Sequence, residues 1–257
     1  MKIIFLKTLK RRIFNKLYTI LLTKTKEEKF KYKNIILKHI LFQAKQENSP
    51  LIVSFPACWS KGAKYNYIGT LAKFNCNKLF LLDDATNNKR GNYLIGEGYI
   101  EAVINLIKQT IKETNPPKII FIGSSKGGYS ALFYSFFIEN VDVCIGAPQY
   151  HLGSYLYKME DKRNLQSIIG NNITKEKIKW LDNYLSSIIS QSTITPNSIY
   201  LQYSNIEHTY QEHIKDLISD IKKRGIKIEE EIKSYQEHGD VAFYYPKFLK
   251  DTIKKII

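Results

Sequence analysis

One serine in this chain stands in a pattern that favours covalent chemistry. Residues 123–127 read Gly-Ser-Ser-Lys-Gly, which fits Gly-x-Ser-x-Gly with Ser125 at the centre. The apolar run 119–122 before it predicts a buried strand, and apolar residues at helical spacing over 129–136 predict a helix after it. A serine on such a strand-to-helix turn needs small residues two positions away on each side, because the turn is sharp and strained. The pattern therefore predicts a nucleophile elbow that carries Ser125.

Two other interpretations of this stretch compete with the elbow. A turn rich in serine and glycine, without any chemistry, has the same composition. A phosphate-binding loop would need Gly-x-x-x-x-Gly-Lys followed by Ser or Thr, whereas Lys126 precedes the glycine pair 127–128. The phosphate-binding loop is therefore excluded, and the strand and helix on either side favour the elbow over the plain turn.

A nucleophilic serine needs a general base, and the base needs an acid that orients it. On an elbow of this kind the chain order is serine, acid, histidine. Among the five histidines, His238 fits best, because it follows the last predicted strand and precedes the last predicted helix. Glu207 is the first carboxylate after the strand predicted over 198–203, so we predict that it orients His238. Glu212 is the rival acid, and Asp240 is disfavoured because it comes after the base in the chain.

Backbone N–H groups should complete the site by stabilising the oxyanion. The residue after the nucleophile, Lys126, is expected to supply one donor, and Ala57 or Cys58, in the loop after the first strand, the other. Cys58, Cys76 and Cys144 are scattered, with neither a metal-ligand spacing nor a disulfide framework, so no metal is predicted and a reducing compartment fits.

Strand and helix patterns alternate along most of the chain. We predict strands over 50–56, 78–82, 119–122, 141–145, 198–203 and 226–232, and helices over 67–74, 99–113, 129–136, 209–223 and 246–256. This alternation predicts a mostly parallel sheet with helices on both faces, whose site lies at the carboxyl ends of the strands. With the elbow, it predicts an α/β-hydrolase fold over residues 36–257 with a cap insertion at about 149–195. The aromatic residues of that insertion either line a sugar-binding wall or pack the cap.

Residues 1–35 are expected to form a separate basic, amphipathic segment. The chain carries a net charge of +15, and residues 1–33 hold eleven Lys and Arg against two Glu. Ile13, Leu17, Ile20 and Leu21 would share one helix face. Such a helix either lies on an anionic membrane surface or packs on the domain with its basic face solvated, and both interpretations stay open.

Several classes of protein are disfavoured by the same composition. No apolar run reaches the ~18 residues of a membrane-spanning helix, and no cleavable signal peptide is recognisable. No base-stacking module accompanies the positive charge, so nucleic acid is not an expected partner. We expect a cytoplasmic protein, with peripheral attachment to the inner membrane face as the alternative that the basic segment suggests.

Three segments together resemble a group of bacterial proteins that modify surface glycans. They are the elbow 123–128, the segment 146–150 (Gly-Ala-Pro-Gln-Tyr) and His238-Gly-Asp, supported by residues 77–84 (Asn-Lys-Leu-Phe-Leu-Leu-Asp-Asp). Over about residues 50–245 the chain resembles the α/β-hydrolase-fold capsular polysaccharide O-acetyltransferases and the related glycan acetyltransferase of the accessory Sec system. The resemblance implies transfer of acetyl from acetyl-coenzyme A to a sugar hydroxyl, with Ser125 carrying the acetyl group. A glycan acceptor and a capsule-synthesis complex are the partners that it implies.

Fold and triad alone do not decide between transferase and hydrolase. A carbohydrate esterase or deacetylase would use the same residues. A non-catalytic scaffold in a glycan export complex is a third possibility, which the complete Ser-Glu-His set disfavours.

Overall fold

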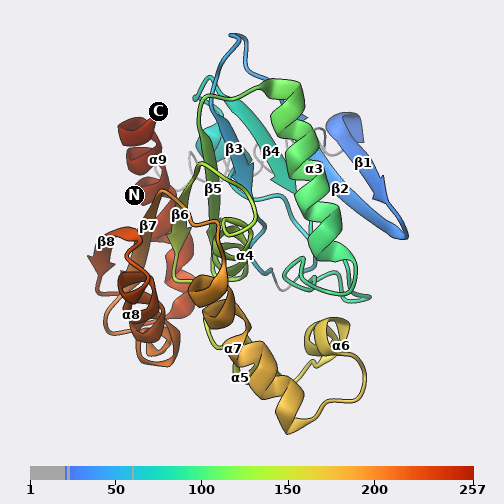
Figure 1. The fold of residues 1–257 in the computed structure, drawn as a ribbon, viewed down its shortest axis with the longest axis vertical. Helices are drawn as coiled ribbons and strands as arrows, with labels where there is room; N and C mark the ends of the chain where they lie inside the picture. The colour runs from blue at the N-terminus through green and yellow to red at the C-terminus, as the bar shows by residue number, and fades with distance from the viewer. Residues whose placement is uncertain (1–20, 22–23, 60) are drawn as a thin grey trace, which may run out of the picture.

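The computed structural model describes residue 21, residues 24–59 and residues 61–257 of the chain. Within these residues, eight strands form one sheet in the order β1-β2-β4-β3-β5-β6-β7-β8 (Figure 1). The strands are β1 (Glu27–Tyr32), β2 (Ile35–Phe42), β3 (Leu51–Ser54), β4 (Asn77–Leu81), β5 (Ile119–Ser124), β6 (Val141–Gly146), β7 (Ser198–Ser204) and β8 (Lys227–Lys233). The six neighbouring strands β4, β3, β5, β6, β7 and β8 run parallel to one another, and β2 pairs with β4 antiparallel. The predicted mostly parallel sheet is therefore present.

Helices cover both faces of the sheet, as the alternating pattern predicted. One face packs against α3 (Tyr99–Thr114), α4 (Lys126–Tyr134) and α8 (Lys215–Lys223), and the other against α2 (Ile68–Leu71) and α9 (Val241–Ile256). The central strands β3, β5, β6 and β7 are buried along their whole length, because helices lie on each side of them. Their near-continuous apolar runs are the reason that the sequence revealed them.

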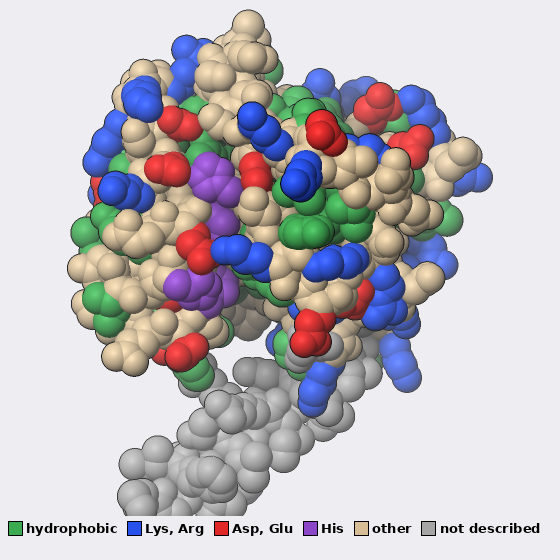
Figure 2. All heavy atoms as spheres, turned by 90° about the horizontal axis from the view of Figure 1, so that it is seen from below, with side chains coloured by type: hydrophobic (Ala, Val, Ile, Leu, Met, Phe, Trp, Pro, Cys, Tyr) green, Lys and Arg blue, Asp and Glu red, His purple; other side chains and the backbone are tan. Residues whose placement is uncertain are grey.

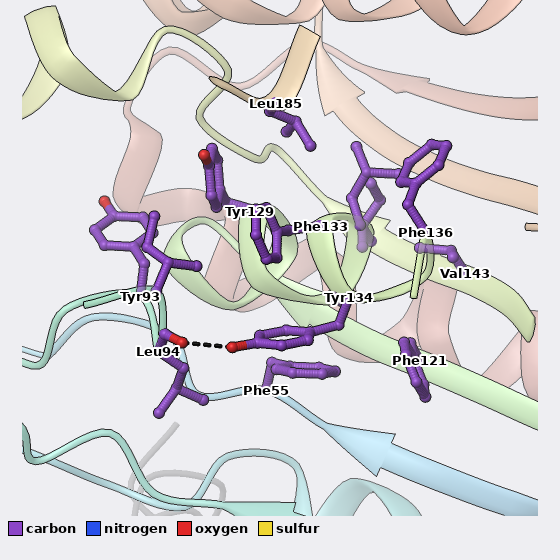
Figure 3. Close-up of a cluster of buried hydrophobic side chains, with 14 of the residues drawn as sticks. Phe55, Tyr93, Leu94, Phe121, Tyr129, Phe133, Tyr134, Phe136, Val143 and Leu185 are labelled. Atoms are coloured by element: carbon purple, nitrogen blue, oxygen red, sulfur yellow. Dashed lines mark hydrogen bonds between the residues drawn. The ribbon is translucent and has the colours of Figure 1, made fainter. Parts of the chain in front are cut away.

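A core cluster around α4 holds the elbow helix against the sheet (Figure 3). Phe55 stacks on Tyr134 with ring centroids 5.4 Å apart, and its ring edge meets Phe121 at the same centroid distance. Tyr134 also donates a hydrogen bond from its hydroxyl to the carbonyl oxygen of Leu94. The aromatic contacts thus join the residue that follows β3 to β5 and α4, the two elements on either side of Ser125.

The segment 149–195, which we expect to form a cap, contains three helices. They are α5 (Leu152–Lys158), α6 (Arg163–Ile169) and α7 (Lys175–Gln191), and they occupy the lower part of Figure 1. Asn164 of α6 donates to the carbonyl oxygen of Gly91, and Asn88 donates to Asp161 over 2.8 Å. The cap segment is thus tied to the loop after β4.

Sequence reasoning missed the hairpin of β1 and β2. These strands pair antiparallel from Glu27 opposite Ile40 to Tyr32 opposite Ile35, and β1 forms one edge of the sheet. The boundary that we set between residues 35 and 36 therefore falls inside this hairpin. Four of the six residues of β1 are lysine or glutamate. Its sequence therefore resembled a solvated basic segment rather than an edge strand.

The C-terminal helix begins earlier than the sequence indicated. We expected it to start at Pro246, because proline is favoured at the first position of a helix. Instead α9 starts at Val241 and contains Pro246, and a 3-10 turn over His238–Asp240 leads into it. The helix predicted over 209–223 likewise consists of a π-helical turn, Tyr210–Ile214, followed by α8.

The amphipathic helix predicted around Ile13, Leu17 and Ile20 lies outside the described residues. In the part of the chain that the structure does describe, no helix is both long and apolar enough to cross a bilayer.

Candidate active site

Ser125 occupies a strained turn between β5 and α4. Its backbone angles are φ 50° and ψ −120°, a conformation that residues with a side chain rarely adopt, and it stands at the N-cap of α4. A Cβ on Gly123 would lie 2.2 Å from the carbonyl oxygen of Gly127, so glycine is required there. The N–H of Ser125 is fixed by a 2.8 Å hydrogen bond to the carbonyl oxygen of Gly146 on β6. Strand, turn and helix form the elbow geometry that the sequence predicted.

The three predicted triad residues meet at the carboxyl ends of the strands. The Nε2 atom of His238 lies 2.9 Å from Ser125 Oγ, and its Nδ1 atom lies 3.0 Å from Glu207 Oε1. A carboxylate only accepts hydrogen bonds, so Nδ1–H donates to Glu207 and Nε2 is left to accept the Ser125 hydroxyl proton. This tautomer is the one that a general base acting on serine requires.

Glu207 is fully enclosed, with a side chain that is 0 % exposed. Burial alone would raise the pKa of this carboxyl group, but hydrogen bonds from His238 and Thr209 outweigh the burial and hold the pKa below its ordinary value. Glu207 therefore stays ionised and can stabilise a protonated His238. The rival acid Glu212 pairs with Lys158 at 3.3 Å instead, and Asp240 occupies the N-cap position of α9.

The predicted oxyanion donors lie on two segments that touch each other. A Cβ on Gly127 would approach the carbonyl oxygen of Phe55 to 2.4 Å, so the loop after β3 packs directly on the elbow. Lys126 is the first residue of α4, where an N–H has no partner inside the helix. Of the other two candidates, the Ala57 N–H donates to Asn66 Oδ1 at 3.1 Å. Because the Ala57 N–H already has this partner, Cys58 is the candidate that we retain as the second donor.

Gln149 is a site residue to which sequence reasoning gave no role. Its side chain is buried, and its Nε2 atom lies 3.0 Å from Ser125 Oγ and 3.4 Å from His238 Nε2. The Ser125 oxygen thus donates to the histidine and accepts from the amide. Its position three residues after the end of β6 was the available signal, since polar residues that follow strand ends can face the site in parallel sheets.

A cavity of about 390 Å³ opens beside Ser125 and His238. It lies between the loop after β3 and the start of α9, and its lining includes Cys58, Trp59, Lys64 and Ala242. The ammonium group of Lys64 lies over the Trp59 ring, 4.9 Å from its centroid. The nucleophile is therefore accessible to a small acyl group through an opening with one positive charge at its wall.

Further histidines surround the site on the side of the cap. His151 donates its backbone N–H to Nδ1 of the buried His213, and the ring of His208 lies 6.4 Å from that of His238. Figure 2 shows histidine side chains gathered on the face seen from below. Among the cap aromatics, Tyr150 is buried, whereas Trp180 is about half exposed and stacks on Tyr184. Tyr150 therefore packs the cap rather than facing a ligand.

Comparison with known proteins agrees with this architecture. No model of a protein family matches the chain, and no curated protein matches its sequence. Solved structures do match, among them the capsule O-acetyltransferase of Neisseria meningitidis serogroup A, with a TM-score of 0.73 and 23 % identity over 88 % of this chain and 94 % of that one. A histidine-to-alanine mutant of that enzyme was solved in complex with CoA.

Two further neighbours extend the comparison. The glycosylation-associated protein complex Gap123 of Streptococcus agalactiae matches with a TM-score of 0.70 and 17 % identity, over 90 % of this chain and 47 % of that one. The serine hydrolase FphF of Staphylococcus aureus, solved with substrate bound, matches at 0.62 and 11 % identity, over 89 % and 96 % of the two chains. At these identities the likeness establishes the α/β-hydrolase fold. The matching structures include the kinds of protein that the sequence motifs resemble.

Proposed function

We propose that this protein is an O-acetyltransferase that moves an acetyl group from acetyl-CoA to a sugar hydroxyl of a bacterial surface glycan. The observation that carries the proposal is the unbroken line of hydrogen bonds from Glu207 through His238 to Ser125 on a strained elbow. The likeness to a capsule O-acetyltransferase, one form of which was solved with CoA, favours this donor and this class of acceptor.

In the proposed first step, Ser125 Oγ attacks the thioester carbonyl while its proton passes to His238 Nε2. The N–H groups of Lys126 and Cys58 would stabilise the oxyanion. The carbon–sulfur bond then breaks, and His238 returns the proton to the leaving thiolate. In the second step a sugar hydroxyl gives its proton to His238 and attacks the acetyl ester, and Ser125 recovers its proton as it leaves. Water has to be kept from the ester for transfer to prevail.

The cap and the basic segment complete the proposal. Residues 149–195 would cover the ester, because they contribute Gln149 at the nucleophile and bind the loop after β4. The basic residues that precede β1 would hold the enzyme at the anionic inner face of a membrane.

The mass of the intact protein after incubation with acetyl-CoA tests the proposal. We expect an adduct of about 42 Da, an acetyl group in place of hydrogen, on the wild-type protein and on Ser124→Ala but not on Ser125→Ala. Ser124 is a matched control, because it neighbours the nucleophile but binds Tyr67 at 2.6 Å. Discharge of the adduct onto added glycan would separate transfer from hydrolysis.

An esterase using the same residues is the second candidate, favoured by the fold shared with a substrate-bound serine hydrolase. Release of acetate from an acetylated sugar without an adduct from acetyl-CoA would support it. Absence of both signals, with a folded protein, would contradict catalysis and favour a scaffold in a multi-protein complex.

A further inference from the structure

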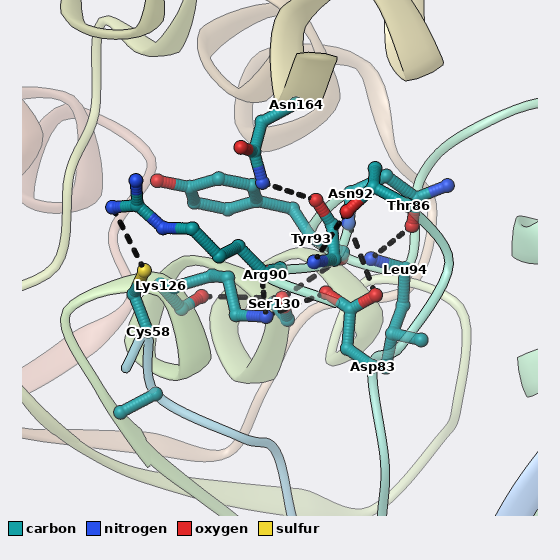
Figure 4. Close-up of polar contacts among 12 residues, drawn as sticks. Cys58, Asp83, Thr86, Arg90, Asn92, Tyr93, Leu94, Lys126, Ser130 and Asn164 are labelled. Carbon is teal, nitrogen blue, oxygen red and sulfur yellow. Dashed lines mark hydrogen bonds and ion pairs between the residues drawn. The ribbon is translucent and has the colours of Figure 1, made fainter. Parts of the chain in front are cut away.

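Two segments that the sequence motifs singled out meet beneath the elbow. Asp83 follows β4 and Lys126 follows Ser125, and Lys126 Nζ lies 2.7 Å from Asp83 Oδ2. The side chains are 0 % and 4 % exposed, so the ion pair is buried (Figure 4). A buried ion pair next to the nucleophile calls for an explanation, because most ion pairs in proteins lie on the solvent-exposed surface.

The pair is part of a built site rather than an incidental contact. Asp83 Oδ1 also accepts the N–H of Asn92 at 3.0 Å, and Lys126 Nζ also donates to the carbonyl oxygen of Arg90 at 2.9 Å. Gly91 lies between these two partners at φ +81°, and a Cβ there would lie 2.0 Å from the Asp83 carboxyl carbon. The loop can therefore close over the pair only with glycine at this position.

The same loop is attached to α4 along one helix face. Lys126, Ser130 and Tyr134 are spaced four residues apart, and each donates to a carbonyl oxygen of the loop, those of Arg90, Tyr93 and Leu94 respectively. Side chains four residues apart share a helix face. These bonds set how α4 is rotated about its axis, and the Lys126 bonds act on its first residue.

Stability does not account for the pair. Burial removes both charges from water, and well-packed apolar residues in place of a buried ion pair are often neutral or stabilising. The lysine also stands at the N-terminus of a helix, where the helix dipole disfavours a cation. The sequence retains a costly arrangement at the residue whose backbone N–H is the expected oxyanion donor.

We infer that Asp83 is a positioning residue of this active site. Through the ammonium group of Lys126 it holds the first peptide of α4 so that the Lys126 N–H points to the position of the oxyanion. The inference rests on the proposed acyl transfer at Ser125. The donor acts on charge that develops in the transition state, so loss of the pair should lower kcat and leave KM nearly unchanged.

The test compares single and double replacements in the full chain. Asp83→Asn and Lys126→Met each leave one buried polar partner, and both should lower the thermal midpoint and the rate of Ser125 acetylation. The double variant Asp83→Leu/Lys126→Met replaces the pair with apolar groups. It removes both buried charges, although the Asn92 N–H and the Arg90 carbonyl lose these partners, so it should recover part of the thermal midpoint yet acetylate tenfold or more slowly, at unchanged KM.

Asp84→Asn is the matched control, because Asp84 neighbours Asp83 but pairs with Lys38. It should acetylate at the wild-type rate. A double variant with wild-type midpoint and wild-type kcat would overturn the inference, since the pair would then be structural only. If the double variant does not fold, Lys126→Met at a temperature where it is folded gives the same comparison, and a wild-type kcat there would equally overturn it. No acetyl adduct on the wild-type protein would instead refute the proposed function.

Discussion

Ser125 Oγ takes part in two side-chain hydrogen bonds, one to His238 and one from Gln149. The second is an addition to the predicted triad. In the acyl transfer that we propose, an amide that donates to the nucleophile would stabilise the negative charge that this oxygen gains when the ester breaks.

We expect Gln149→Leu to slow both formation and discharge of the acetyl ester by roughly tenfold to a hundredfold, the cost of a hydrogen bond to a charged group. Single-turnover measurement of the mass adduct gives both rates. Gln202→Leu is the control, because Gln202 is equally buried but its side-chain atoms have no hydrogen-bond partner among the described residues. Equal rates in the two variants would show that Gln149 only fills space.

The triad could be predicted because strand ends and chain order restrict the choice of residue. His238 and Glu207 each follow a strand, and the structure brings both to Ser125. Gln149 follows a strand as well, but an amide belongs to no catalytic spacing and a buried glutamine often only packs. The partner of Lys126 was hidden for another reason, since Asp83 is 43 residues away in sequence.

The elbow depends on contacts between backbone atoms. β5 and α4 approach so closely that Gly123 would carry a Cβ into the Gly127 carbonyl, whereas a Cβ on Gly239, beside His238, meets nothing within 4 Å. Glycine therefore has a structural role in the elbow and none of this kind in the histidine loop.

Gly123→Ala should destabilise the fold by about 3 kcal/mol or more, since the backbone must move to relieve the overlap. Thermal unfolding should show a midpoint lower by roughly 10 °C for a chain of this size. Gly239→Ala, with open space, should unfold like the wild type. A Gly123→Ala midpoint within error of that control would contradict the close approach of β5 and α4.

Elements with a strong apolar run were predicted almost to their ends, whereas the first hairpin and the start of α9 were not. β1 carries two Glu and two Lys among its six residues, so its place in the sheet comes from tertiary pairing with the mostly apolar β2, which local pattern does not reveal. For α9, Pro246 indicated the start of the helix, yet the proline is the sixth residue of a helix that begins at Val241.

At the scale of the whole molecule, one buried histidine links stability to pH. Burial lowers the pKa of His213 to about 4, and the charge of His151 adds to the effect. Lys158 and His238 lower it further, while Glu212 opposes them. His213 therefore takes up a proton at a lower pH in the folded protein than in the unfolded chain.

Stability should fall as the pH drops from about 6.5 to about 4, because protons bind the unfolded state preferentially in that window. The loss amounts to roughly 3 kcal/mol at its lower end, from the size of a pKa unit. Thermal midpoints across this range should fall less in His213→Gln than in the wild type. The exposed His208→Gln should follow the wild type, and parallel curves for all three would contradict the prediction.

The basic segment makes a separate prediction. Residues 1–20 hold six Lys and Arg and no acidic residue, so they should bind anionic lipid, and their removal, which leaves the hairpin of β1 and β2 in place, should weaken binding to phosphatidylserine vesicles. Sedimentation with vesicles at low salt measures this, and neutral vesicles are the control. Unchanged binding to anionic vesicles at low salt would contradict membrane attachment, because screening is weakest there.

The β8 edge of the sheet has a consequence for how copies of this protein meet. Its residues 227–233 read Lys-Ile-Glu-Glu-Glu-Ile-Lys, and Glu229 and Glu230 form ion pairs with Lys255 and Lys222. A strand from another molecule that docked there would have to displace these ion pairs and bring a row of carboxylates together. Even at high protein concentration, β8 should therefore not pair with a strand of a second molecule to continue the sheet.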